Sequence, residues 1–313
     1  MSRSDDTLLD EPTSRWERLA LTSAGIPFRL KVAAVWVVIF LILAGFFAIA
    51  DFDTGFMKDE FPFIVKGLRY TLYMAVVGIA LAVVLAALGA LGRISSNPIA
   101  YGVSGFYVSF FRGTPLIVQM TLIYSALPQI GFNLVAKYPS VPDQLASFLT
   151  LQAVVAGMIA LGLNYGAYMT EIFRAGIQSV ASGQGEAADA LGMTYRQKMR
   201  KVVLPQAFRV IIPPTGNEFI AMMKDTALVS FLGTALTSAE IFRRAQYVGT
   251  THFRSLEALV VAAGLYWSLT VIFTFFQRRL ETRIGRGYVR TVGVKRPGSV
   301  AQPHAQGAGQ VEL

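Results

Sequence analysis

Long segments without a single charged side chain constrain this fold more than any other feature of the sequence. Residues 32–50, 70–92, 144–170 and 258–277 each contain no Asp, Glu, Lys or Arg. A helix needs about 20 mostly apolar residues to cross a hydrocarbon core that is about 30 Å thick. We therefore expect an all-α membrane protein in which each of these segments contains a transmembrane helix.

Two further transmembrane helices are expected in residues 99–127 and 206–232. These segments contain ionisable residues, namely Arg112 in the first, and Arg209, Glu218, Lys224 and Asp225 in the second. Pro115 in the first segment, and Pro213 and Pro214 in the second, are expected to interrupt their helices. The segments together give six transmembrane helices. Composition supports a membrane protein, because only 15% of the residues are charged against about 25% in soluble domains.

The positive charges are concentrated at one end of the predicted helices. If six helices cross the membrane, most of the 28 Lys and Arg residues fall on the side of the two termini. Cytoplasmic flanks of membrane proteins carry such an excess. Both termini are therefore expected in the cytoplasm, in a multi-pass protein of the plasma (inner) membrane. Contact with anionic membrane lipid accounts for the net charge of +9, and no nucleic-acid partner is expected.

Three segments are expected to lie outside the main helical domain. Residues 1–31 form a polar cytoplasmic leader, and residues 32–50 form an N-terminal transmembrane helix. The apolar part of that helix is longer than in a secretory signal and follows several Asp and Glu residues, so we expect it to be retained. Residues 291–313 are rich in Gly, Pro and Gln, and are predicted to be a disordered cytoplasmic tail.

Common catalytic and metal-binding patterns are absent from the sequence. The chain has no cysteine and only two histidines, so no thiolate or histidine metal cluster is expected. It contains no nucleotide-binding G-x-x-x-x-G-K-[ST] motif, nucleophile elbow or zinc-protease motif. We therefore expect that the chain is not an enzyme, and we predict no catalytic residue, metal or cofactor in it.

A polar segment before the fifth predicted helix is expected to form two short helices joined by a tight corner. The sequence from Glu186 favours a helix with its carboxylates near the amino end, where the helix dipole prefers negative charge. Gly192 is expected to end this helix, and Thr194 and Gln197 have the spacing of a capping box that starts the second one. Residues 174–205 are thus predicted to be a cytoplasmic loop that is rigid enough to transmit force to a partner.

The same loop resembles the E-A-A-x3-G-x9-I-x-L-P motif of permease subunits in ABC importers. It matches at every fixed position except Val202, where the family usually has isoleucine. The resemblance implies that the motif residues contact a separate ABC ATPase, which binds ATP and Mg; these residues are Glu186, Ala187, Ala188, Gly192, Leu204 and Pro205. It also implies a second permease chain, identical or homologous, an external solute-binding protein, and ATP-driven alternating access.

Other motifs resemble the polar amino acid uptake class, the relatives of the histidine and glutamine permeases. They occupy residues 111–115, 163–168, 171–177 and 224–230. This resemblance covers residues 67–281 and implies a type I importer core similar to the methionine permease, preceded by one extra helix. The implied substrate is a polar amino acid or a close derivative. Ala181, where the family commonly has proline, leaves the rigidity of the loop open.

Polar side chains inside the predicted helices are expected to face a translocation path, because such groups usually line a bundle interior or a water-filled cavity. Asn164, Tyr168 and Glu171 follow one helical stripe. The full set of candidates is Arg112, Gly113, Thr114, Pro115, Gln119, Asn164, Tyr168, Glu171, Asn217, Glu218, Lys224 and Asp225.

Two interpretations of the charged candidates remain open. In the first, Arg112 faces the carboxylate of the substrate, and Glu171 or Glu218 pairs with its ammonium group. In the second, Arg112 pairs with Glu171, or Lys224 pairs with Asp225, and these ion pairs only hold helices together.

Two other classes of protein are compatible with the hydropathy. An ion-coupled secondary transporter also uses broken helices, but such folds usually contain inverted repeats, and none is evident in this sequence. A membrane assembly protein that transports nothing would also have this hydropathy, but that interpretation does not explain the charged residues inside the membrane. The exact amino acid, homodimeric or heteromeric pairing, and the role of the extra helix do not follow from the sequence.

Overall fold

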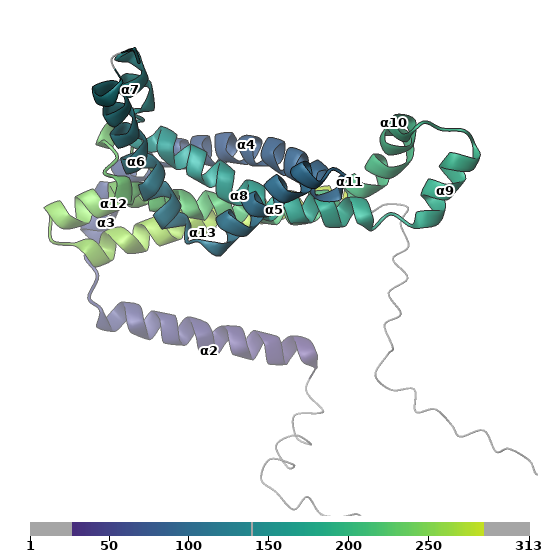
Figure 1. Ribbon diagram of the computed structural model, residues 1–313. Coiled ribbons are helices and arrows are strands. Elements are labelled where there is room, and N and C mark those ends of the chain that lie inside the picture. The colour runs from purple at the N-terminus through teal and green to yellow at the C-terminus, as the bar shows by residue number, and fades with distance from the viewer. Residues whose placement is uncertain (1–26, 139, 285–313) are drawn as a thin grey trace, which may run out of the picture. The chain divides into compact units, whose positions relative to one another are not determined.

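The computed structural model describes residues 27–138 and 140–284, and every regular element within these ranges is helical (Figure 1). The predicted leader, up to residue 26, and the predicted tail, residues 291–313, lie outside the described residues. The chain divides into two compact units. The first contains residues up to Tyr73 together with Thr226–Trp267, and the second contains Met74–Asp225 together with the residues from Ser268 onward.

The second unit contains the predicted site. Its helices are the part of α4 (Leu68–Ile94) from Met74 onward, α5 (Pro98–Gly113), α6 (Leu116–Lys137), α7 (Gln144–Leu149), α8 (Ala153–Gln178), α9 (Ser182–Ala190), α10 (Tyr195–Lys198), α11 (Leu204–Asp225) and the end of α13 (Ser255–Ile284). A π-helical turn, Met199–Val203, joins α10 to α11. The helical path therefore continues without a break from Tyr195 to Asp225.

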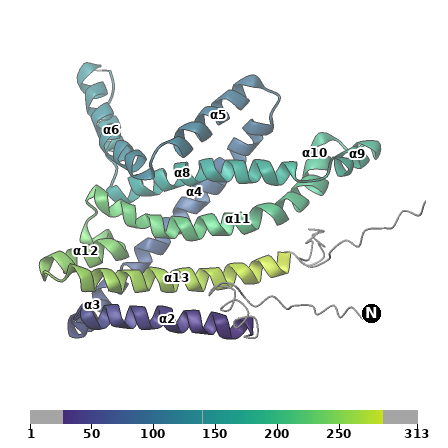
Figure 2. The same ribbon diagram turned by 90° about the horizontal axis from the view of Figure 1, so that it is seen from below.

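Helix α8 is the most buried element of this unit. It packs against α5, α6 and α11, and Figure 2 shows α8 and α11 side by side. Many of its buried residues are small, including Ala156, Ala160, Gly162, Gly166 and Ala167. Small side chains allow helix backbones to approach closely, which is the usual basis of helix packing within a membrane.

The first unit contains a buried glutamate, Glu240, directly before α12 (Ile241–Thr251). Glu240 caps α12 by accepting hydrogen bonds from the backbone N–H groups of Phe242 and Arg243, at 2.7 and 2.5 Å. It also accepts hydrogen bonds from the hydroxyls of Ser230 and Tyr266. These four donors satisfy the buried carboxylate, and no cation pairs with it among the residues that the structure describes.

Other parts of the first unit differ strongly in burial. Helix α3 (Thr54–Val65) packs against α12, whereas α2 (Phe28–Ile49) buries no residue in this chain.

The chain from Thr226 to Leu232 and from Leu236 to Ser238 forms 3₁₀ turns. The guanidinium of Arg244 donates to the carbonyls of Ala239 and Leu236, which fixes the second of these turns.

The six predicted transmembrane segments all contain helices, but their details differ. Helices α2, α3–α4, α8 and α13 are long and apolar enough to span a membrane, and the bent pair α5–α6 passes the same test as one span. Residues 144–170 form α7 and the greater part of α8. Helix α11 has 22 residues, four of them charged, so it lacks the apolar composition of the other spans.

The predicted interruption at Pro213 and Pro214 is wrong, because α11 passes through both residues. Each proline removes one backbone donor. The carbonyls that lose a donor are those of Arg209 and Val210, one turn earlier. Two side chains bond other carbonyls of the same stretch: the Thr215 hydroxyl donates to the Ile211 carbonyl at 2.8 Å, and the Gln277 amide donates to the Pro213 carbonyl at 3.2 Å.

Candidate functional site

A sharp break between α5 and α6 forms one wall of the candidate site. The two helices meet at an angle of 107°, since Pro115 has no N–H to continue the α5 ladder. The buried Gln119 amide donates to the carbonyls of Phe111 and Thr114, at 2.9 and 3.0 Å. The Asn164 amide donates to the same Phe111 carbonyl at 2.9 Å and to the Gln119 amide oxygen at 3.1 Å. These bonds satisfy carbonyls that the end of α5 leaves free.

A pocket of about 550 Å³ opens beside this break. Its lining comes from the α5–α6 break, α8 and α11: Arg112, Gly113, Thr114, Pro115, Leu116, Asn164, Tyr165, Tyr168, Glu218 and Asp225. We call this space the polar pocket. Its volume lies within the range typical of small-molecule sites, about 300–1,000 Å³.

The polar pocket contains one cation and two carboxylates. The guanidinium carbon of Arg112 lies 5.1 Å from the centre of the Tyr168 ring, within the range of a cation–π contact. The Tyr165 hydroxyl donates to Asp225 at 2.8 Å. Glu218 lies two helical turns before Asp225 on α11. Opposite charges facing one space are suited to a ligand that carries both a carboxylate and an ammonium group.

Eight of the twelve residues predicted for the translocation path line this pocket, and four do not. Gln119 lies behind the wall and braces it. Asn217 accepts a hydrogen bond of 2.8 Å from Gln277, and Lys224 is exposed on α11. Glu171 forms ion pairs with Arg93 and Arg174 and does not pair with Arg112. The sequence prediction missed Tyr165, because the pocket follows residues 164, 165 and 168 of α8 and leaves the stripe that continues to Glu171.

The second candidate region is the corner between α9 and α10, residues 182–198, at one end of α8 and α11 (Figure 1). Gly192 adopts a φ of +70°, and the Met193 N–H donates to the Ala188 carbonyl at 3.1 Å. This is the arrangement that ends a helix at a glycine. Thr194 and Gln197 form the predicted capping box, with both reciprocal bonds present.

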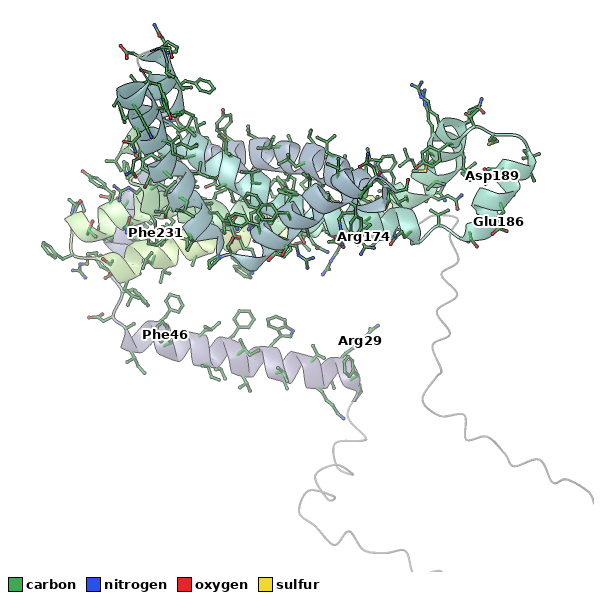
Figure 3. The ribbon with its side chains drawn as sticks, in the orientation of Figure 1. Arg29, Phe46, Arg174, Glu186, Asp189 and Phe231 are labelled. Atoms are coloured by element: carbon green, nitrogen blue, oxygen red, sulfur yellow. The ribbon has the colours of Figure 1, made fainter. Side chains whose placement is uncertain are left out.

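An ion pair joins the two helices of the α9–α10 corner. The Lys198 ammonium lies 2.8 Å from both carboxylate oxygens of Asp189. Figure 3 shows Asp189 and Glu186 on α9, and both residues are exposed. Ala188 is buried, with 3% exposure, so this motif residue packs inside the corner whereas Glu186 and Ala187 are on its surface.

The predicted position of the acidic residues within this helix is wrong. Helix α9 begins at Ser182, its first turn contains no acidic residue, and Asp189 lies in its last turn. The helix dipole therefore does not stabilise these carboxylates. Asp189 is stabilised instead by its ion pair with Lys198. Leu204 and Pro205 are the first residues of α11. Leu191 and Tyr195, which are not among the predicted ATPase-contacting residues, are 77% and 67% exposed within the corner.

Comparison with known proteins identifies the family. Residues 78–286 match the family model described as "Binding-protein-dependent transport system inner membrane component". The chain is 38% identical over 239 residues to the probable amino-acid ABC transporter permease protein PatM of Vibrio harveyi. The aligned region covers 76% of this chain and 99% of PatM. The chain belongs to this family. It is an amino-acid ABC importer permease of the inner membrane.

Solved structures support the fold of this permease. A crystal structure described as an amino acid ABC transporter with histidines matches with a TM-score of 0.63 at 36% identity, over 72% of the permease and 96% of the solved chain. An inward-facing structure of the MetNI methionine ABC transporter matches with a TM-score of 0.56 at 18% identity, over 73% and 99% of the two chains. The predicted type I importer fold is therefore confirmed.

Proposed function

We propose that this permease moves polar amino acids, or close derivatives, across the plasma membrane with energy from a separate ABC ATPase bound at the α9–α10 corner. The observation that carries the proposal is the continuous helical path from Tyr195 to Asp225. This path begins at the capping box of the corner and ends at a carboxylate of the polar pocket. A movement of the corner is thereby linked to the pocket through one continuous helical path.

The substrate is proposed to bind in the polar pocket by its two backbone charges. Arg112 pairs with the carboxylate of the amino acid, and Glu218 and Asp225 receive its ammonium group. Glu171 is a weaker candidate for this second role, because two arginines already engage its carboxylate. A guanidinium is well suited to a carboxylate, since its donors match both carboxylate oxygens.

The proposed complex contains four further kinds of component. A second permease chain, identical or homologous, completes the membrane part, and two ATPases bind ATP and Mg. An external solute-binding protein delivers the amino acid at the membrane face opposite the α9–α10 corner. The corner and both termini lie in the cytoplasm. ATP-driven closure of the ATPases brings the two corners together and switches the pocket between outward and inward access.

Uptake into vesicles tests this proposal. The permease would be reconstituted with its ATPase and solute-binding protein, and a panel of radiolabelled polar amino acids would be supplied with ATP inside or outside the vesicle. ATP-dependent uptake of at least one amino acid is expected. The matched control is a complex whose ATPase lacks its catalytic glutamate. Uptake that persists in this control under an ion gradient would contradict ATP coupling and favour a secondary transporter.

Pocket variants test the substrate site within the same system. Arg112→Gln and Asp225→Asn are expected to raise the half-saturating amino acid concentration, because each removes one of the charges that face the substrate. Arg209→Gln, a change of an exposed arginine on α11 outside the pocket, is the control. Equal half-saturating concentrations in all three variants would remove Arg112 and Asp225 from substrate binding.

A further inference from the structure

A cluster of two arginines and one glutamate lies outside the polar pocket, near the end of α8 that leads to α9. One Glu171 carboxylate oxygen is 3.3 Å from the Arg93 Nε on α4. The other is 2.7 Å from a terminal nitrogen of Arg174, one turn further along α8. Arg174 also donates to the Gln178 amide at 2.6 Å. The carboxylate is thus held once across helices and once within its own helix.

Arg93 extends this cluster to a third helix. Its guanidinium carbon lies 4.7 Å from the centre of the Tyr101 ring on α5. A planar guanidinium can stack on an aromatic ring while its edge pairs with a carboxylate. Arg93, on α4, therefore contacts both α5 and α8. We call Arg93, Tyr101, Glu171 and Arg174 the Arg93 clamp.

The helices joined by the Arg93 clamp are closely packed beside it. The Ser104 hydroxyl on α5 donates to the Gly89 carbonyl on α4 at 2.7 Å. A side chain at Gly89 would place its Cβ 2.3 Å from the Thr170 hydroxyl on α8. Thr170 is fully buried and adjacent to Glu171. The clamp therefore lies at one end of an interface in which α4 approaches α5 and α8 closely at Gly89.

Helix α8 connects the clamp to both regions of the site. Asn164, Tyr165 and Tyr168 line the pocket, Glu171 follows within one turn, and α8 ends at Gln178, shortly before α9 begins at Ser182. Figure 3 shows Arg174 on the stretch of α8 that leads to α9. Helix α5, which Arg93 also contacts, ends at the break that forms a wall of the pocket.

We infer that Arg93 is a positioning residue for transport: it joins the α9 end of α8 to α4 and α5, so that a displacement of the α9–α10 corner moves both walls of the polar pocket together. This inference rests on the proposed function. Arg93 touches neither the pocket nor the corner, and its action is through Glu171 and Tyr101. Loss of Arg93 is expected to weaken the link of α8 to α4 and α5 at its α9 end, so that ATP is hydrolysed with less amino acid transported.

The cluster provides a matched pair of variants. Arg93→Gln removes the contact between helices but leaves Glu171 paired with Arg174, so no carboxylate is left without a cation. Arg174→Gln makes the same charge change beside the same carboxylate but keeps the link from α4 to α8. The two variants thus separate the link between helices from the local charge.

The first measurement is the number of amino acids imported per ATP hydrolysed by the reconstituted complex. Arg93→Gln is expected to lower this ratio about fivefold or more, which is a typical size for residues that carry coupling between distant sites. Arg174→Gln is expected to change it less, and Arg93→Lys to restore part of it by keeping the ion pair. A merely structural role lowers uptake and hydrolysis in the same proportion, and an unchanged ratio in Arg93→Gln would overturn the inference.

The second measurement does not require transport. Because the chain contains no cysteine, spin labels can be placed at Val103→Cys on α5 and Gln184→Cys on α9, both exposed positions. The distribution of distances between the labels is expected to broaden in Arg93→Gln but not in Arg174→Gln. Equal widths in both variants would refute the clamp. If the wild-type complex lacked ATP-dependent uptake, the proposed function would be wrong. The spin-label distances would still test whether Arg93 links α8 to α5.

Discussion

The hydroxyl of Tyr165 on α8 donates a hydrogen bond of 2.8 Å to the carboxylate of Asp225, the last residue of α11. This bond fixes a pocket carboxylate with a neutral donor. A neutral donor orients a carboxylate but leaves its negative charge available to a ligand. Within the described part of the chain, Asp225 is therefore held in place without an arginine or lysine counter-ion.

Removal of the Tyr165 hydroxyl is expected to weaken amino acid binding without unfolding the permease. Tyr165→Phe keeps the ring and frees Asp225 to rotate. The dissociation constant of a radiolabelled amino acid for the purified complex should rise by up to about tenfold, or roughly 1.4 kcal/mol, which is at the low end for a hydrogen bond to a charged group. Tyr124→Phe on α6, outside the pocket, is the control. Equal constants in both variants would show that Tyr165 does not position Asp225 for substrate.

Gly192 is expected to be required for ATPase binding because of its backbone conformation. Its φ of +70° is unfavourable for any residue with a side chain, whereas an added Cβ would meet no neighbouring atom. Gly192→Ala should therefore strain only the α9–α10 corner, by about 1 kcal/mol or more. The amount of ATPase captured by the purified permease is expected to fall several-fold.

Gly183 offers a matched control for the Gly192 experiment. It also lies on α9 with open space around its Cβ, but its φ is not positive. Gly183→Ala should leave ATPase capture unchanged, and a glycine-to-alanine change in a helix is mildly favourable on propensity alone. Equal losses in the two variants would indicate that added bulk, and not backbone strain, is responsible.

The sequence predicts what local chemistry determines. The apolar segments predict helices because length and hydropathy are properties of one segment. The Thr194–Gln197 capping box is confirmed because its partners are three residues apart. The stripe of Asn164, Tyr168 and Glu171 shows the limit of such patterns. Periodicity tells which residues share a helix face, but it does not tell which neighbouring helix that face meets.

The remaining features depend on contacts between distant parts of the chain. Glu171 meets Arg93, which is 78 residues earlier in the sequence, and in the sequence Arg93 is only one of many basic residues flanking a helix. Gln277 supports the Pro213 carbonyl from α13 across 64 residues. Neither pairing can be read from spacing. For the same reason the sequence could not distinguish Gln119, which braces the pocket wall, from the residues that line the pocket.

The buried amides of Gln119 and Asn164 are expected to stabilise the α5–α6 break as one unit. Gln119→Leu or Asn164→Leu leaves the Phe111 carbonyl with one donor fewer and the remaining amide with an unpaired group. Each change should lower the free energy of unfolding by about 1–3 kcal/mol. The double variant should lose less than the sum, because the two residues share a hydrogen bond. Thermal unfolding in detergent measures these changes.

Thr121→Val is the control for this cycle. The Thr121 hydroxyl donates to the Ile117 carbonyl one turn earlier on α6, and the residue is exposed. A bond of this kind is local and solvent-accessible, so its loss should change stability little. Additive losses in the Gln119 and Asn164 variants would contradict a shared network.

The close approach of α4 and α8 predicts a compensating pair of substitutions. A Cβ at Gly89 would lie 2.3 Å from the Thr170 Oγ1 and 2.9 Å from its Cγ2. Gly89→Ala is therefore expected to destabilise the permease by about 1–3 kcal/mol, the usual cost of overpacking a buried interface. Thr170→Ala removes both of these atoms, so the double variant Gly89→Ala/Thr170→Ala should be more stable than Gly89→Ala alone. Gly102→Ala, whose added Cβ meets no neighbour, should be nearly neutral. Thermal unfolding of the wild type, Gly89→Ala, Gly89→Ala/Thr170→Ala and Gly102→Ala measures these stabilities. A double variant less stable than Gly89→Ala would exclude a steric conflict with Thr170.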